Sequence, residues 1–360
     1  MTGTDKLTIA RQRLHRQQIS YSKFRSPHEV AEWLGAMQGQ DYNMAKWAIG
    51  VRLPGSTDKA IEEALAKGKI LRTHLLRPTW HLVSADDIHW MLELTAPHIK
   101  PLLKSRHAEL GLTQAIINKS YGVLEKALTS GNHLTRDEII GALGKAKLHI
   151  NSSQAYHLLL RAELDGIICS GAMKEKEQTY ALLAERAPKK KILGRDEALS
   201  ELARRYFTSR GPATLHDFVW WSGLPVADAK KSLEMTKGDI ASEQIGSQAY
   251  WFSRAFSSPD GDKDSLHLLP AFDEFIISYK DRSPSFPVEN QKNAISSNGV
   301  FKPVIVLNGQ VIGIWKRTTK KNKTIVETHF FQPPNKTTKI LMEKEVAAYG
   351  QFLNRTTEIA

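Results

Sequence analysis

The chain has 360 residues, of which 41% are hydrophobic, and its 50 Lys and Arg against 38 Asp and Glu give a formal charge of +12. This length and apolar content predict two or three globular domains and exclude a disordered chain. The positive charge favours a polyanionic partner such as nucleic acid, although charge also serves simple solubility.

A single cysteine, Cys169, excludes an internal disulfide and any zinc site built from several cysteines. The thirteen histidines show no His-Glu-x-x-His spacing and no phosphate-binding glycine loop occurs, so we expect neither a metal nor a cofactor. No apolar stretch is long enough for a signal peptide or a membrane span. We therefore expect a cytoplasmic protein without a membrane partner.

Three segments of the chain share the order of a short helix, a turn, a second helix and a β-hairpin, which is similar to a winged helix in pattern. In the first, Ser26 and Pro27 begin a helix, and Gln38-Gly39-Gln40-Asp41 forms a turn before a second helix over 42–53. A further helix from Thr57 reaches Leu65.

The hairpin of this first segment covers residues 69–83, where apolar and polar residues alternate as in paired strands. Its basic residues are Arg72, His74 and Arg77. Thr79 and His81 share one face, because they are two positions apart on a strand.

The second segment opens with a capping box formed by Thr135 and Glu138. A helix over 152–164 follows, and strands over 166–169 and 179–182 form the hairpin. The third segment has helices over 199–209, 214–224 and 225–235, and then a strand at 250–252.

From Leu268 onward the pattern changes to strands joined by turns. The predicted strands are 269–279, 303–307, 310–317 and 323–331. Asn308-Gly309 is a strong hairpin signal, and a helix over 337–352 follows the last strand.

The predicted fold class is therefore mainly α with β (α+β), with three tandem winged helices followed by a small C-terminal β-barrel or sheet. We place the domains at 1–110, 111–190, 191–266 and 267–360.

Winged helices beside a strong positive charge favour double-stranded DNA over RNA, although such modules also bind proteins. The expected DNA contacts are Arg72, His74, Arg77, Lys280 and Arg282. Asp273-Glu274 and Lys280-Asp281-Arg282 bracket a predicted strand, where they form an ion-pair network or line the DNA face.

Gln38 and Gln40 are the candidate catalytic residues, because two amides two positions apart on a turn can face one cleft. Hydrolysis of an N-glycosidic bond passes through an oxocarbenium-like sugar, for which a carboxylate normally activates water. A base made cationic by alkylation leaves without an acid, so two amide oxygens that position water can suffice. The alternative is that these glutamines cap a helix or read a base edge.

Three neighbouring residues are possible supporting groups. Asp41 is the obvious carboxylate alternative, but we favour its role as the N-cap of the next helix. Thr79 and His81 complete the set, with a structural role as the default for His81.

Several blocks spread along the chain give it a likeness to a known family. These blocks are Met37-Gln38-Gly39-Gln40-Asp41, residues 76–83, 211–224, 269–283 and Val311-Ile312-Gly313-Ile314-Trp315. In this set and order, the chain resembles the bacterial AlkZ-like DNA glycosylases of the AlkZ/YcaQ superfamily.

The resemblance implies three tandem winged helices and a β-barrel around a DNA channel. It also implies monofunctional excision of N7-alkylated purines and, in some members, unhooking of interstrand crosslinks. The family signature of Gln, a small or apolar residue, and Gln or Asp maps onto Gln38, Gly39 and Gln40. This is the double-glutamine version, found on the AlkZ side of the family.

We therefore expect a monomeric DNA glycosylase acting on duplex DNA that contains alkylated or crosslinked purines. The alternative is a non-catalytic winged-helix transcriptional regulator, which should dimerise and read spaced half-sites.

Overall fold

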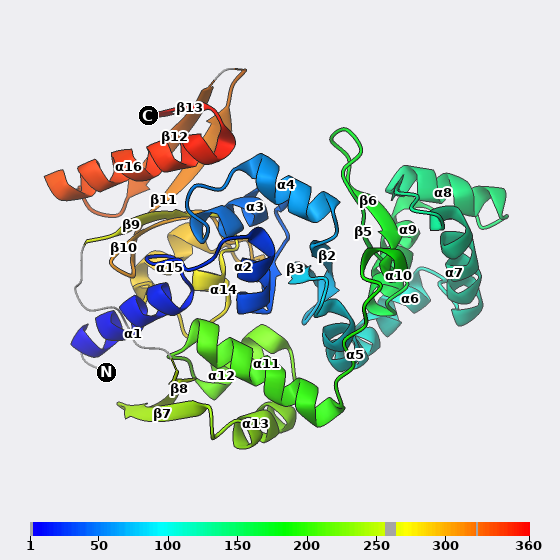
Figure 1. Ribbon diagram of the computed structural model, residues 1–360, viewed down its shortest axis with the longest axis horizontal. Helices are drawn as coiled ribbons and strands as arrows, with labels where there is room; N and C mark the ends of the chain where they lie inside the picture. Colours follow the sequence, from blue (N-terminus) through cyan, green and yellow to red (C-terminus); the bar gives the residue numbers. More distant parts are fainter. Residues whose placement is uncertain (1–2, 256–263, 322) are drawn as a thin grey trace. The chain divides into compact units, whose positions relative to one another are not determined.

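The computed structural model describes residues 3–255, 264–321 and 323–360, and the chain divides into two compact units of mixed helix and strand (Figure 1). Unit 1 comprises Met1–Glu62, Leu199–Trp221 and Pro225–Ala360, and unit 2 comprises Glu63–Ala198 with Ser222–Leu224. This division differs from the four consecutive domains expected from the sequence, whose boundaries stay predictions.

Unit 1 begins with the elements that carry the two candidate glutamines. These are α1 (Gly3–Arg16), α2 (Pro27–Leu34), β1 (Ala36–Gln38), α3 (Tyr42–Val51) and α4 (Asp58–Ala66), whose last residues belong to unit 2. The helix start expected at Ser26 is confirmed. The helix ends at Leu34, because Gly35 adopts a φ of 71° that favours glycine and directs the chain into β1. Gln38 therefore ends a strand, and does not open a turn directly after a helix.

The next part of unit 1 confirms the helices and the strand expected for the third segment. Its elements are α11 (Arg195–Arg210), whose residues before Leu199 belong to unit 2, α12 (Leu215–Ser222), whose last residue does too, α13 (Val226–Met235), β7 (Ile240–Ile245) and β8 (Gln248–Ser253). The buried rings of Tyr206, Phe207, Phe218 and Trp221 pack together, and neighbouring ring centroids lie between 5.0 and 5.4 Å apart. This aromatic cluster fixes α12 against the end of α11.

The C-terminal part of unit 1 is built on a sheet whose described strands follow the order β13-β12-β11-β10-β9. The strands are β9 (Leu266–Leu269), β10 (Val304–Leu307), β11 (Gln310–Thr319), β12 (Lys323–Phe330) and β13 (Thr356–Ile359). Asn308 and Gly309, at φ values of 50° and 85°, form the predicted hairpin turn between β10 and β11. Because β13 and β9 are the edges of this order, the expected barrel is not confirmed.

The prediction of one strand over 269–279 is wrong. Strand β9 ends at Leu269, and the short helix α14 (Glu274–Ile277) follows it. Asp273 caps this helix, since its carboxylate accepts a hydrogen bond from the main-chain N–H of Phe275 at 2.9 Å. A short apolar run does not by itself distinguish a buried strand from a buried helical turn.

Two more helices complete unit 1, namely α15 (Val288–Ala294) and α16 (Lys336–Leu353). Helix α16, which confirms the predicted C-terminal helix, lies beside β13 and β9 (Figure 1). The Trp47 ring of α3 packs against Tyr349 and Phe352 of α16 at centroid distances of 4.8 and 4.9 Å. A Cβ at Gly50 would lie 2.6 Å from the Phe352 ring, so this approach requires glycine. Helix α3, which follows the two glutamines, is thus held on α16.

Unit 2 consists of short helices with two small groups of paired strands. Its elements are β2 (Ile70–Leu75), β3 (Thr79–Ser84), α5 (Ile88–Ile99), the 3-10 helix η1 (Lys100–Leu103), α6 (Lys104–Glu109), α7 (Gln114–Leu128), β4 (Leu134–Thr135), α8 (Arg136–Lys145), α9 (Ser152–Leu164), β5 (Ile168–Ser170), β6 (Thr179–Leu182) and α10 (Leu183–Arg186). Strands β2 and β3 pair antiparallel, as the sequence predicted. The capping box of Thr135 and Glu138 is confirmed at the start of α8, and α9 has the predicted bounds.

The core of unit 2 lies among α7, α8, α9 and β5. The buried apolar side chains of this cluster are Leu124, Leu128, Ile139, Leu143, Leu148, Leu159, Ala162 and Ile168. A second capping box, formed by Asn151 and Gln154, starts α9 and fixes the direction of this helix.

Strand β9 and helix α16 bring two ionisable groups together in unit 1. His267 Nδ1 lies 4.0 Å from Glu345 Oε2. Burial raises the pKa of Glu345 to about 7 and lowers the pKa of His267 to about 4. At pH values between these two pKa values both side chains are uncharged. The uncharged state avoids the free-energy cost of keeping a charge in a largely buried position.

We predict that Glu345→Gln removes a pH dependence of the stability of unit 1. The folded-state pKa of Glu345 lies above its ordinary value of 4.5, so its stabilising contribution is complete below pH 4.5 and is lost as the pH rises through about 7. The glutamine variant should therefore gain about 1–3 kcal/mol relative to the wild type between pH 5 and pH 8. Urea unfolding of both proteins at the two pH values checks this, because the titration of His267 cancels in the comparison. An equal difference at both pH values would contradict it.

Candidate active site

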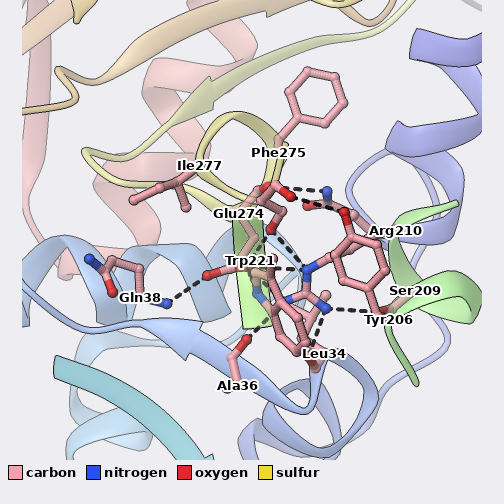
Figure 2. A network of polar contacts seen from close by, with 12 residues as sticks. Leu34, Ala36, Gln38, Tyr206, Ser209, Arg210, Trp221, Glu274, Phe275 and Ile277 are labelled. Atoms are coloured by element: carbon pink, nitrogen blue, oxygen red, sulfur yellow. Dashed lines mark hydrogen bonds and ion pairs between the residues drawn. The ribbon is translucent and has the colours of Figure 1, made fainter. Parts of the chain in front are cut away.

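Gln38 lies at the end of β1 in unit 1, and its main chain and side chain have different surroundings. Its main-chain N–H donates a hydrogen bond to Glu274 Oε1 at 2.7 Å. Its side chain extends away from this contact (Figure 2). The residue is 7% exposed, and its side-chain oxygen has no hydrogen-bond partner among the described residues. A buried amide oxygen without a partner calls for an explanation, and binding of water or of a ligand is one.

Gln40 and Asp41 follow in the turn after β1, and both are exposed. Asp41 Oδ1 accepts a hydrogen bond from the main-chain N–H of Met44 at 3.0 Å, so Asp41 is the N-cap of α3. This is the role that the sequence analysis favoured for Asp41.

A buried network of polar contacts surrounds the main chain of β1 (Figure 2). At its centre is an ion pair in which Arg210 Nη2 of α11 lies 2.7 Å from Glu274 Oε2 of α14. Trp221 Nε1 and Ser278 Oγ donate to the same carboxylate oxygen at 3.1 and 2.5 Å. Arg210 is 0% exposed and Glu274 is 2% exposed, so both charges are withdrawn from water.

Arg210 also holds the chain that leads into β1. Its Nη1 donates to the carbonyl oxygen of Leu34 at 2.7 Å, and its Nη2 donates to that of Ala36 at 2.8 Å. Together with the bond from Gln38 to Glu274, these contacts fix three main-chain positions within five residues.

The charge state of Glu274 follows from two opposing effects. Burial raises the pKa of Glu274, but the Arg210 guanidinium and the hydrogen bonds from Ser278, Arg210 and Gln38 hold the pKa below its ordinary value. The carboxylate is therefore ionised at neutral pH.

A second buried ion pair involves Asp273, the residue directly before Glu274. Arg52 at the end of α3 donates from Nη1 and Nη2 to the two carboxylate oxygens of Asp273, each at 2.9 Å, and both side chains are 0% exposed. Asp273 and Glu274 do form ion pairs, but their partners here are Arg52 and Arg210, which lie outside the run Lys280-Asp281-Arg282 expected to share the network. The expected position of Asp273 and Glu274 at the end of a β-strand is wrong, because they begin α14.

Sequence reasoning missed the role of Arg210. No local pattern links it to Glu274, which lies 64 residues away. The signal available was Glu274 itself, a charged residue just before the apolar run Phe275-Ile276-Ile277, because a charge placed among core residues is normally paired.

The hairpin residues expected to contact DNA lie in unit 2, and two of them are buried there. His74 is 1% exposed, its Nδ1 is hydrogen-bonded to the carboxylate of Glu163 on α9, and its ring centroid lies 4.0 Å from that of Trp80. Burial raises the pKa of Glu163, and His74 partly offsets this. Within unit 2, His74 is thus packed against Trp80 and paired with Glu163, and its expected contact with a phosphate stays a prediction.

Arg72 is also packed within unit 2. It is 6% exposed, its guanidinium carbon lies 4.0 Å from the Trp80 ring centroid, and it donates a hydrogen bond to Gln178. Its expected phosphate contact likewise stays a prediction. Arg77, in the turn between β2 and β3, is half-buried.

Thr79 and His81 lie on β3, as predicted. His81 is 1% exposed, and its Nδ1 lies 2.9 Å from the carbonyl oxygen of Thr79. This placement agrees with the structural role taken as the default for His81.

Lys280 and Arg282 lie in the loop after α14 in unit 1. Lys280 is exposed and lines a groove of about 760 Å³ together with His216 and Trp251. Arg282 is partly buried, and its Nε donates to the carbonyl oxygen of Ile276 at 3.0 Å. Of these two side chains, Lys280 is the more exposed.

Two classes of site are not found in the part of the chain that the structure describes. No three His, Cys, Asp or Glu side chains there come together in a way that could hold a metal ion. Likewise, none of the described helices is both long and apolar enough to cross a bilayer.

A family model described as "DNA glycosylase AlkZ-like" matches residues 31–352. The chain belongs to the AlkZ-like family of DNA glycosylases. It is therefore an enzyme of DNA repair, a hydrolase that acts on N-glycosyl bonds, and the expected family resemblance is confirmed.

A sequence relative and a solved structure, both from Streptomyces sahachiroi, are similar to this chain. The "Interstrand DNA cross-link repair glycosylase" is 23% identical over 326 residues, which are 84% of this chain and 85% of that protein. The solved structure of the DNA glycosylase AlkZ matches with a TM-score of 0.81 at 20% identity, and the match covers 98% of this chain and 99% of that one. This chain therefore has the fold of that structure.

We predict that His74→Ala lowers the stability of the glycosylase by about 3 kcal/mol, because it leaves the buried Glu163 without its partner. Denaturant unfolding measures the loss, and Lys176→Ala, at an exposed position in the same unit, serves as the control. Unchanged stability together with weaker DNA binding would instead support His74 as a phosphate contact.

Proposed function

We propose that this glycosylase hydrolyses the N-glycosidic bond of N7-alkylated, cationic purines in duplex DNA, and that Gln38 and Gln40 position the attacking water at C1′ of the deoxyribose. The observation that carries the proposal is the Gln38 side-chain oxygen, which is buried without a partner among the described residues at the end of a rigidly held strand.

The chemistry suits this substrate class. A purine alkylated at N7 already carries the positive charge that makes it a good leaving group, so no acid is needed at the base. What remains is to hold a water molecule and to stabilise a sugar that becomes positively charged, and correct positioning alone supplies several kcal/mol of such a barrier. Amide oxygens are hydrogen-bond acceptors and can do both.

The carboxylates near Gln38 are already engaged. Asp41 caps α3, and Glu274 accepts hydrogen bonds at both of its oxygens. These contacts favour the amides over a carboxylate as the groups that meet water.

Unhooking of interstrand crosslinks is the sharper form of the proposal. It is supported by the printed name of the Streptomyces sahachiroi relative, "Interstrand DNA cross-link repair glycosylase". A crosslinked base stays tied to both strands and cannot be flipped out as an ordinary substrate is. The site would then have to act on a base that remains close to the duplex.

We further propose that the helix and hairpin segments are three winged helices that bind the DNA duplex. The order of α8, α9, β5 and β6, and that of α11, α12, α13, β7 and β8, supports this for the second and third segments. Arg77, Lys280 and Arg282 are the proposed phosphate contacts. The C-terminal barrel, the monomeric state and the cytoplasmic location stay predictions.

We predict that Gln38→Ala and Gln40→Ala each lower the rate of base excision by about 100-fold, because each removes an acceptor that positions water. The assay uses duplex oligonucleotides with one N7-methylguanine and a crosslinked duplex alongside, followed by alkaline cleavage at abasic sites. Gln351→Ala, which changes an exposed glutamine on α16, is the matched control. Full activity in either site variant would remove that residue from the mechanism, and unchanged strands despite tight DNA binding would favour a non-catalytic regulator.

We predict that Asp41→Asn keeps the wild-type excision rate, because asparagine also caps helices but carries no charge. Asp41→Ala should instead lower stability by about 1 kcal/mol through loss of the cap. Measured single-turnover rates on the N7-methylguanine duplex separate the two roles. A loss of about 100-fold in Asp41→Asn would make Asp41 the group that activates water.

A further inference from the structure

The ion pair of Arg210 and Glu274, called here the clamp, holds the strand that carries Gln38 only through its main chain. Arg210 binds the carbonyl oxygens of Leu34 and Ala36, and Glu274 binds the N–H of Gln38. Among the described residues, the Gln38 side-chain oxygen has no hydrogen-bond partner, and the side chain points away from the clamp (Figure 2).

The clamp is itself fixed by groups from two further elements. Ser278 Oγ donates to Glu274 Oε2 at 2.5 Å and accepts from Arg210 Nε at 2.9 Å. The Trp221 ring lies 4.4 Å from the guanidinium carbon of Arg210, and its Nε1 donates to Glu274. Each charged group is thus held from at least two sides, which leaves it little freedom to move.

We infer that Glu274 and Arg210 are positioning residues for the excision reaction, which set the location of the Gln38 amide by fixing the main chain of β1. The inference rests on the proposed function of Gln38. Neither side chain is placed to meet DNA, because both are buried and their polar atoms are used within the network.

The main-chain position of Gln38 determines where its side-chain oxygen lies. A side chain that ends a short strand moves with its own peptide plane, so a small rotation at Gln38 displaces the amide oxygen by a larger distance. Groups that position a reacting water must be held within about 0.5 Å. Arg210 binds the carbonyl oxygen of Ala36, and Glu274 binds the N–H of Gln38. Because both contacts are made to β1, they restrain the strand against rotation as well as translation.

The test needs a variant that loosens the clamp without breaking it. Glu274→Ala would leave Arg210 as a buried, uncompensated charge, and such a protein can fail to fold. Ser278→Ala removes one donor and one acceptor of the network and keeps the ion pair. The matched control is Ser232→Ala in α13, another fully buried serine of unit 1, whose hydroxyl donates to the carbonyl oxygen of Ala229 at 2.8 Å.

We expect Ser278→Ala to lower the single-turnover excision rate about 10-fold and to leave the affinity for lesion-containing DNA within about 2-fold, whereas Ser232→Ala changes neither. Trp221→Phe, which removes another donor to Glu274, should act in the same direction. If the clamp acts through Gln38, the loss disappears when Ser278→Ala is made in a Gln38→Ala background. An equal loss in both backgrounds, or an equal loss in Ser232→Ala, would overturn the inference.

A second readout does not depend on activity. Hydrogen exchange at the main-chain N–H of Gln38, followed by NMR, should be faster in Ser278→Ala than in the wild type and unchanged in Ser232→Ala. Unchanged exchange in Ser278→Ala would also overturn the inference. If the wild type excises none of the tested lesions, the proposed function fails, and the exchange measurement still decides whether the clamp holds the strand.

Discussion

The ion pair of Arg210 and Glu274 is the contact on which the geometry of the candidate site depends. Two charges withdrawn from water are costly, and their attraction offsets that cost only where the remaining donors and acceptors are satisfied. Here they are satisfied largely by the main chain of Leu34, Ala36 and Gln38 and by side chains of α12 and the loop after α14. The ion pair therefore joins helices that are distant in sequence to the strand that ends at Gln38.

Near this strand, the charged side chains are engaged in ion pairs or in a helix cap, whereas the side-chain oxygen of Gln38 has no partner among the described residues. The carboxylates of Glu274 and Asp273 are paired with arginines, and Asp41 completes a helix start. What is left near the end of β1 is the neutral amide of Gln38. A neutral acceptor fits a family of DNA glycosylases whose proposed substrates here already carry a positive charge on the leaving base.

Local structure was largely predictable from the sequence, whereas long-range pairing was not. Capping by Thr135 and Glu138 and the Asn308-Gly309 turn involve residues that are neighbours in sequence, and both were confirmed. The prediction of a strand over 269–279 is wrong because short apolar stretches such as Phe275-Ile276-Ile277 fit a buried strand and a buried helical turn equally well. The candidate glutamines come from a sequence motif and stay a prediction. The contact between Arg210 and Glu274 and the burial of His74 depend on tertiary packing that no local pattern encodes.

The unpartnered oxygen of Gln38 implies a trade-off between stability and activity. A buried acceptor that lacks a hydrogen bond costs about 1–3 kcal/mol, so an apolar side chain of similar size would make a more stable protein. Selection for heat resistance alone would be expected to replace Gln38, and the resulting protein would keep its fold while losing its proposed chemistry. The stability that this glycosylase loses at Gln38 is therefore linked to keeping one side-chain oxygen without a partner among the described residues.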